Sequence, residues 1–180
     1  MIGNGVRADE AEIARSLPGD DLLPDADVVM DRAFSLPAPP DQVWPWLVQL
    51  GKRRAGWYLP RRLERLLPRD RRGARGIDAR WQSLGVGDVI ADYGGRDATF
   101  TVAAIERPHH LVHTSQRGHL HLTWALVLEP EDDGTRLHLR LRLGPVKRRL
   151  LVTTGGELID VLTVAGLARG LRERLTATER

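Results

Sequence analysis

Residues 38–58 read APPDQVWPWLVQLGKRRAGWY and hold three of the chain's five tryptophans, one of its two tyrosines and three prolines. Each large ring buries on the order of 150–250 Å² when it is packed. A segment this rich in rings forms either the densest part of the core or the wall of an apolar cavity. Which of the two holds decides whether the protein binds a small molecule.

Turn-forming residues predict two short helices in and after this stretch. Pro40 suits a first helical turn, where a backbone N–H would have no partner, and Gly51 suits the end of the helix. Pro45 lies about one turn into this helix, so we expect it to be short or kinked. A second helix is expected over residues 60–67, PRRLERLL, with Pro68 closing it.

Alternating side chains predict an antiparallel sheet around these helices. One strand is expected before them and five after them, over residues 28–36, 89–93, 99–105, 110–115, 119–129 and 135–143. In the last strand, leucines at 137, 139, 141 and 143 alternate with Arg136, His138, Arg140 and Arg142. This pattern predicts one face packed on the core and one face in solvent.

A long amphipathic helix is expected from about Gly156 to Thr176, with an apolar stripe that includes Leu158, Leu162, Leu171 and Leu175. It is the only expected element long enough to cover the sheet's apolar face. The chain therefore predicts an α+β fold: a curved antiparallel sheet wrapped around a long C-terminal helix, with two short helices after the first strand. We expect an acidic, partly ordered N-terminal extension over residues 1–26 and one domain over residues 27–180.

Composition and charge exclude several classes of protein. The chain has 180 residues and no cysteine, which excludes disulfides and thiolate metal sites. No apolar run approaches membrane-spanning length and no signal peptide is recognisable, so we expect a cytoplasmic protein without stable membrane insertion. Residues 52–80 carry 11 basic and 3 acidic side chains. A nucleic-acid partner is not expected, because no aromatic ring interleaves this basic segment between Leu59 and Arg80.

Histidines and carboxylates are the candidates for chemistry. His119 and His121 have a spacing that suits a metal, but we expect both to face solvent beside Arg140, so no metal and no cofactor is predicted. His113 is the one candidate for acid–base chemistry, provided that its strand turns it toward the cavity. A hydrogen-bonded histidine at the cavity rim is the alternative interpretation. Asp92 lies near a hairpin from which it could reach a pocket.

Rings near the expected cavity are the candidate ligand contacts. Together with His113 they are Trp46, Trp57, Tyr58, Trp81, Tyr93 and Trp124. Trp44 and Trp46 lie roughly 200° apart on a helix, so we expect one of them in the core and the other at the rim.

Several motifs of this chain are similar to those of one superfamily. They are LPGD (17–20), APPDQVWPWLVQLG (38–51), RAGWY (54–58), VGD (86–88), PHHLV (108–112) and GLRER (170–174). The chain resembles the helix-grip superfamily, which includes StAR-related lipid-transfer domains, Bet v 1-type plant proteins and polyketide cyclase/dehydrase-like (SRPBCC) proteins. Within it, the chain looks like a bacterial, often actinobacterial, group. Relatives often continue after Gly-Trp-Tyr with Ser-Tyr-Asp, whereas this chain continues with Leu59, Pro60 and Arg61.

The resemblance implies an internal cavity that takes a small hydrophobic or aromatic molecule. Because this fold hosts different activities, two alternatives stay open. One is an enzyme of the polyketide cyclase or aromatase type, with His113 or Tyr58 steering enolisation. The other is an interaction module that uses the basic surface of Arg61–Arg75. A homodimer is compatible with each of these.

Overall fold

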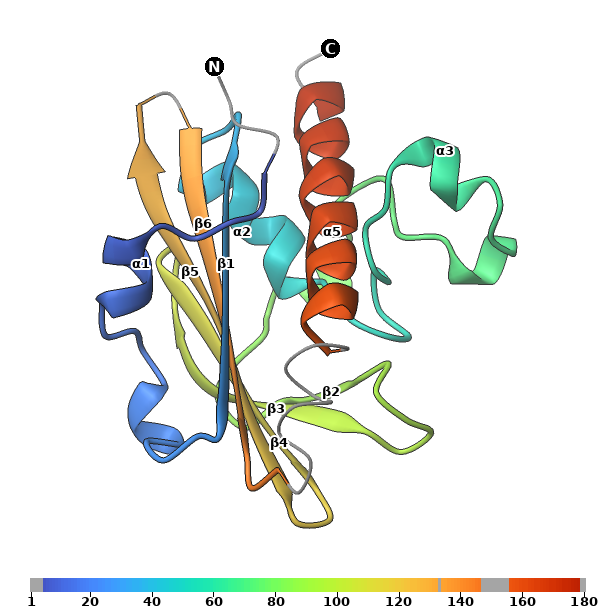
Figure 1. The fold of residues 1–180 in the computed structure, drawn as a ribbon. Helices are drawn as coiled ribbons and strands as arrows, with labels where there is room; N and C mark the ends of the chain where they lie inside the picture. Colours follow the sequence, from blue (N-terminus) through green and yellow to red (C-terminus); the bar gives the residue numbers. More distant parts are fainter. Residues whose placement is uncertain (1–4, 133, 147–155, 179–180) are drawn as a thin grey trace.

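The computed structural model describes residues 5–132, 134–146 and 156–178. Within these ranges, one antiparallel sheet of six strands, in the order β1-β6-β5-β4-β3-β2, curves around helix α5 (Figure 1). The α+β architecture predicted from the sequence is confirmed. No helix in the described ranges is long and apolar enough to cross a membrane.

The strands follow the predicted positions closely. They are β1 (Val28–Leu36), β2 (Val89–Ala91), β3 (Thr99–Glu106), β4 (His110–Arg117), β5 (Leu120–Glu131) and β6 (Gly134–Gly144). The helices are α1 (Glu10–Ala14), α2 (Pro40–Val48), α3 (Arg61–Glu64) and α5 (Glu157–Thr178), with 3₁₀ turns at Asp20–Leu22, Arg69–Arg71 and Ala79–Trp81.

Two helices differ from their predictions. The helix expected over residues 60–67 is only the single turn of α3, because Leu63 and Leu66 are exposed and the buried side chain is Glu64. In α5, Leu158 and Leu162 are also exposed. Neither leucine lines the cavity beside this helix, and its buried stripe begins at Val164.

The concave face of the sheet forms the core against α2 and α5. Register aligns Phe34 of β1 with Leu137 of β6, and Leu139 of β6 with Leu126 of β5. All four side chains are almost fully buried in one cluster with Leu171 of α5. Since each buried side chain of this size contributes about 1.5–3 kcal/mol, this face drives the sheet onto the helix.

The convex face of the sheet does not lie in solvent, so the prediction that one face of the last strand is solvent-exposed is wrong. His138 and Arg140 are only 1% and 4% exposed, because residues 5–27 pack across this face. Arg140 donates to the backbone oxygen of Arg15 at 2.8 Å and to Asp20 at 2.8 Å. Asp31 accepts from Arg140 at 2.7 Å and lies 2.7 Å from the His138 ring. The acidic N-terminal segment thus covers a row of polar side chains and offsets their charge. In the sequence, the same row has the pattern of a solvent-exposed strand face.

Helix α2 buries both of its tryptophans, whereas we expected only one of them in the core. Trp44 and Trp46 belong to the main core cluster. The sheet and α5 pack on this short helix, and Tyr58 of the following loop also contacts it. The Trp46 ring meets the Tyr58 ring edge-on, with centroids 5.6 Å apart.

Candidate functional site

A cavity of about 480 Å³ lies between the concave face of the sheet and the first turns of α5. Trp57 borders it from the loop after α2, Phe100 from β3 and Trp124 from β5. Thr163 and Val164 close it from α5. The cavity therefore occupies the place that wrapping a sheet around one helix is expected to leave.

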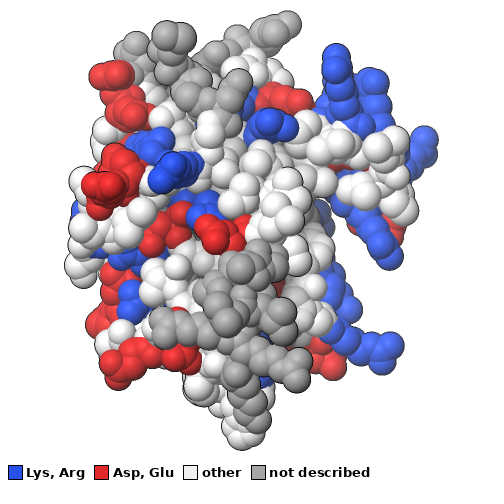
Figure 2. Space-filling view, in the orientation of Figure 1, with Lys and Arg blue, Asp and Glu red and all other residues white. Residues whose placement is uncertain are grey.

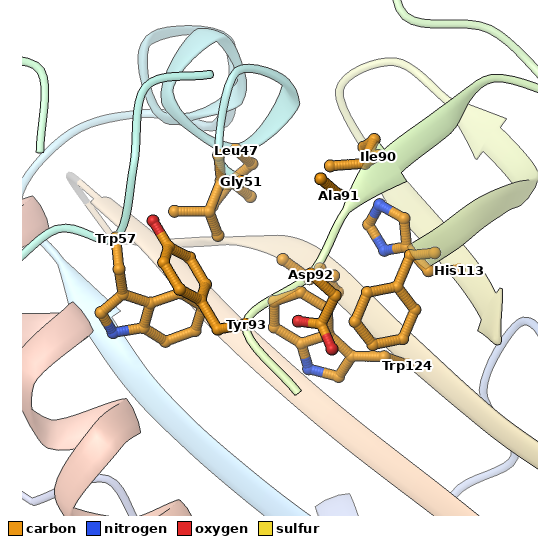
Figure 3. Close-up of a pocket in the computed structure, with 12 residues that line it drawn as sticks. Leu47, Gly51, Trp57, Ile90, Ala91, Asp92, Tyr93, His113 and Trp124 are labelled. Carbon is orange, nitrogen blue, oxygen red and sulfur yellow. The ribbon is translucent and has the colours of Figure 1, made fainter. Parts of the chain in front are cut away.

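Aromatic rings form one continuous wall of this cavity. Trp124 lies between Trp57 and His113 (Figure 3), with ring centroids 6.1 Å from Trp57 and 5.5 Å from His113 and near-parallel planes in both pairs. Phe100 lies 5.8 Å from Trp124. The indole N–H of Trp57 donates to the backbone oxygen of Thr163 at 3.3 Å, which fixes this ring against α5. A fixed wall of rings offers a large apolar contact at little entropic cost.

A smaller recess of about 30 Å³ lies beside the cavity and shares Trp57, Phe100 and Trp124 with it as lining residues. Beyond these shared rings its walls are mostly apolar, with His113 as an exception (Figure 3). Strand alternation explains this placement, because His113 pairs with Trp124 and shares its face of the sheet. His113 thus lines the smaller recess and is not among the residues that border the larger cavity.

Two ion pairs complete the lining. Asp92 accepts from Arg117, and the Arg117 guanidinium lies 5.5 Å from the centroid of the Phe100 ring. Asp160 of α5 lies 2.9 Å from Arg32 of β1. Burial raises the pKa of Asp160, and Arg32 opposes that rise. Each carboxylate at the cavity thus lies beside a cation, and Arg32 also lies 3.7 Å from Glu157.

Burial lowers the pKa of His113 to about 4; a hydrogen bond with the Trp124 backbone opposes this shift, and the Arg54 charge adds to it. The His113 ring is therefore neutral near pH 7. A neutral imidazole offers one hydrogen-bond donor and one acceptor. Within the described ranges, no three His, Asp or Glu side chains lie close enough to hold a metal ion.

The depressed pKa of His113 predicts that the folded state loses stability as the pH is lowered. The unfolded chain takes up this proton near pH 6.5 and the folded chain only near pH 4, so folding is progressively penalised between these values. The full loss amounts to about 3 kcal/mol. Urea unfolding of the wild type and of His113→Leu across this window measures it. An equal pH slope in both proteins would contradict the burial of a neutral imidazole.

The structure brings four of the seven predicted ligand contacts to the cavity or to the recess beside it: Trp57, Tyr93, His113 and Trp124. The other three lie elsewhere. Tyr58 is fully buried, and its hydroxyl donates to the backbone oxygen of Trp46 at 2.9 Å. The guanidiniums of Arg54 and Arg80 lie 4.5 Å and 5.7 Å from the centroid of the Trp81 ring.

Sequence reasoning missed Phe100, Arg117 and the α5 residues Asp160 and Thr163 as parts of the cavity wall. Phe100 carried a usable signal, since it lies two residues before Val102, which pairs with His113. Residues that alternate on one strand share a face.

Part of the basic segment of residues 52–80 makes intramolecular contacts at the surface. Lys and Arg side chains gather over α3 and the loop after it (Figure 2). Arg75 binds Glu64 and Glu173, and Arg72 donates to the backbone oxygens of Leu67 and Arg65. These contacts hold the loop to itself and to α5.

Comparison with known proteins gives a likeness of fold. No protein-family model matches the chain, and no curated protein matches it. A solved protein from Nitrosomonas europaea matches with a TM-score of 0.53 and 19% identity over 86% of this chain and 97% of its own. One from Rhodobacter sphaeroides has a TM-score of 0.53 and 18% identity over 86% and 95%. One from Mesorhizobium loti has a TM-score of 0.51 and 19% identity over 84% and 98%.

These likenesses span nearly the full length of each matched chain, so the whole architecture is shared. At such low identity they say nothing about ligands or reactions. The antiparallel sheet that curves around a long C-terminal helix, with short helices after the first strand, is the helix-grip fold.

Proposed function

We propose that the protein binds one small hydrophobic or aromatic molecule in the cavity between the sheet and α5. The observation that carries the proposal is the wall of Trp57, Phe100 and Trp124 on a cavity of about 480 Å³. Ligand pockets commonly measure about 300–1,000 Å³ and are lined mainly by apolar and aromatic side chains. A molecule of two or three fused rings fits this volume.

The electrostatics of the lining favour a neutral ligand. Arg117 is paired with Asp92 and Arg32 with Asp160, so a ligand carboxylate would compete with a resident carboxylate for either cation. Burying an additional unpaired charge is costly. Affinity therefore rests on ring contacts and a few hydrogen bonds.

Titration with the neutral probe N-phenyl-1-naphthylamine tests the proposal. We expect saturable enhancement of the probe's fluorescence with one site per chain, together with quenching of protein tryptophan fluorescence. Trp81→Phe is the matched control, since this ring lies outside the cavity, and its affinity is expected to equal that of the wild type. Enhancement that never saturates, or a site that disappears in Trp81→Phe, would refute binding in this cavity.

A cyclase or aromatase activity is the second candidate, favoured by ionisable groups in direct contact at the cavity. Asp92 and Arg117 are hydrogen-bonded there, and His113 lies in the adjoining recess. An acid–base reaction requires such groups beside the substrate. Turnover of a poly-β-ketothioester that is lost in His113→Leu would support it. Binding of the neutral probe with no turnover would leave the binding function alone.

A further inference from the structure

A second surface lies apart from the cavity, on residues 61–72, which we call the α3 lobe. It comprises α3 and the loop after it, and it stands out on the side of α5 that faces away from the sheet (Figure 1). Lys and Arg side chains gather over this lobe (Figure 2).

The inner side of the lobe is fixed to the rest of the protein by an acidic side chain. Glu64 is buried, and its carboxylate binds Arg174 and Arg75. The backbone N–H of Arg61 donates to Glu173 of α5 at 2.7 Å. The lobe is therefore held in a set position, and its leucines at positions 63 and 66 remain on the outside.

These two leucines form an apolar stripe that faces solvent. Leu66 is 82% exposed and Leu63 is 48% exposed. The backbone N–H of Leu66 donates to the backbone oxygen of Leu63 at 3.1 Å, and residues three apart in such a tight turn lie one above the other. The hydrophobic contribution of both side chains is thus available to a partner that removes them from water.

Arginines with exposed side chains flank the stripe. None of the following five forms an ion pair with a residue in the described ranges: Arg61, Arg62, Arg65, Arg69 and Arg71. Arg72 is also exposed and donates only to backbone oxygens, which do not offset its charge. Against these cations the lobe exposes one carboxylate, that of Asp70. Its outer surface is therefore strongly positive and partly apolar.

This combination fits the surface of an anionic lipid bilayer. Guanidinium groups bind the phosphates of lipid headgroups, and apolar side chains beside them enter the boundary between headgroups and acyl chains. A nucleic acid offers phosphates but no apolar layer for Leu63 and Leu66. The chain also has no aromatic ring between Leu59 and Arg80 on which bases could stack.

We propose that the α3 lobe docks the protein reversibly on anionic membrane surfaces. Leu63 and Leu66 enter the headgroup boundary, and the arginines around them bind lipid phosphates. Because the lobe projects from the molecule, it can touch a flat surface before the rest of the protein does (Figure 1). The proposal concerns a surface separate from the cavity and does not depend on what the cavity binds.

Co-sedimentation with lipid vesicles tests the proposal. We expect the wild type to sediment with phosphatidylcholine vesicles that contain about 30 mol% phosphatidylserine and to stay in solution with pure phosphatidylcholine. Raising the ionic strength from about 0.05 M to about 0.5 M is expected to release the protein, because salt screens the attraction between arginines and headgroups.

Paired arginine substitutions test the charged part of the surface. Arg62→Gln, Arg65→Gln is expected to weaken vesicle binding by roughly 30-fold, since it removes two charges that lie near the anionic surface. The matched control is Arg7→Gln, Arg107→Gln, which removes two exposed arginines outside the lobe. It changes the net charge equally and should bind the vesicles nearly as tightly as the wild type.

Leu66→Ser tests the apolar stripe. We expect about tenfold weaker binding, because the side chain no longer enters the headgroup boundary. Val86→Ser is the control, since Val86 is 68% exposed outside the lobe. Each variant changes exposed side chains only, and circular dichroism confirms that it is folded before it is tested.

The outcomes decide between lipid and other partners. No sedimentation with anionic vesicles at low salt would overturn the proposal, as would equal binding by the wild type and Arg62→Gln, Arg65→Gln. Binding that Leu66→Ser leaves unchanged would overturn it too, and competition by duplex DNA would then identify a nucleic-acid surface instead. None of these measurements uses the cavity, so their failure leaves the binding function intact.

Discussion

Replacing Arg174 with methionine is expected to lower the free energy of unfolding by about 3–5 kcal/mol. The Arg174 side chain is fully buried and donates to Glu64 at 2.6 Å, to the backbone oxygen of Ala74 at 2.7 Å and to that of Leu59 at 3.2 Å. Its guanidinium also lies 4.5 Å from the centroid of the Tyr58 ring. The substitution leaves the buried Glu64 carboxylate with Arg75 as its remaining cation, and it removes a donor from the backbone oxygens of Ala74 and Leu59.

The position of Arg174 in the fold makes this loss large. Gly170 lies one turn earlier on α5, and a Cβ at this position would come within 2.6 Å of the Tyr58 backbone. The helix therefore meets residues 58–59 at backbone contact distance, and Arg174 fastens the same segment by hydrogen bonds. Trp57, which precedes this segment, owes its place in the cavity wall to the same attachment.

Urea unfolding measures this loss, with Arg62→Met as the control. Arg62 is exposed on α3, so the same chemical change there should alter the free energy of unfolding by less than about 0.5 kcal/mol. The double variant Glu64→Gln, Arg174→Met should recover part of the loss, because it removes a buried charge that has lost one of its two cations. If Arg174→Met unfolds at the same urea concentration as Arg62→Met, the buried network does not hold the loop to α5.

Replacing Trp124 with alanine is expected to weaken binding of N-phenyl-1-naphthylamine by about 10- to 100-fold. Trp124 contacts three other rings of the site, those of Trp57, Phe100 and His113. Its removal therefore takes away the centre of the aromatic wall and widens the cavity, so the ligand loses contact area on several sides.

Fluorescence titration of Trp124→Ala, Trp124→Phe and Trp81→Phe checks this expectation. Trp124→Phe retains one ring and should lose less affinity than the alanine variant, whereas Trp81→Phe should lose none. An alanine variant that is folded by circular dichroism and binds the probe as tightly as the wild type would show that the ligand does not use this wall.

The sheet and α5 could be predicted from the sequence because their signals are local. Alternation in the last strand predicted its buried leucines, and β6 places Leu137, Leu139 and Leu143 in core clusters as expected. The same alternation misled on the opposite face. A row of arginines looks identical whether water or an acidic segment covers it, and the partner of Arg140 lies 120 positions away at Asp20.

The candidate site was predictable in part for the same reason. Trp57 and Trp124 could be placed from the expected architecture. Tyr58 could not, because a shift of one position along the loop changes a side chain from the cavity wall to the core. Its neighbour Trp57 faces the cavity, while Tyr58 turns inward to the Trp46 carbonyl and Arg174. That Nδ1 of His113 has no hydrogen-bond partner among the described residues depends on every neighbour at once, so no local pattern reveals it.

The five indole N–H groups of the chain provide the most direct test of binding in this cavity. In ¹H–¹⁵N spectra, titration with 2-naphthol is expected to shift the indole signals of Trp57 and Trp124 and to leave those of Trp44, Trp46 and Trp81 in place. Shifts confined to Trp81, or no indole shift at saturating probe, would contradict a ligand site between the sheet and α5.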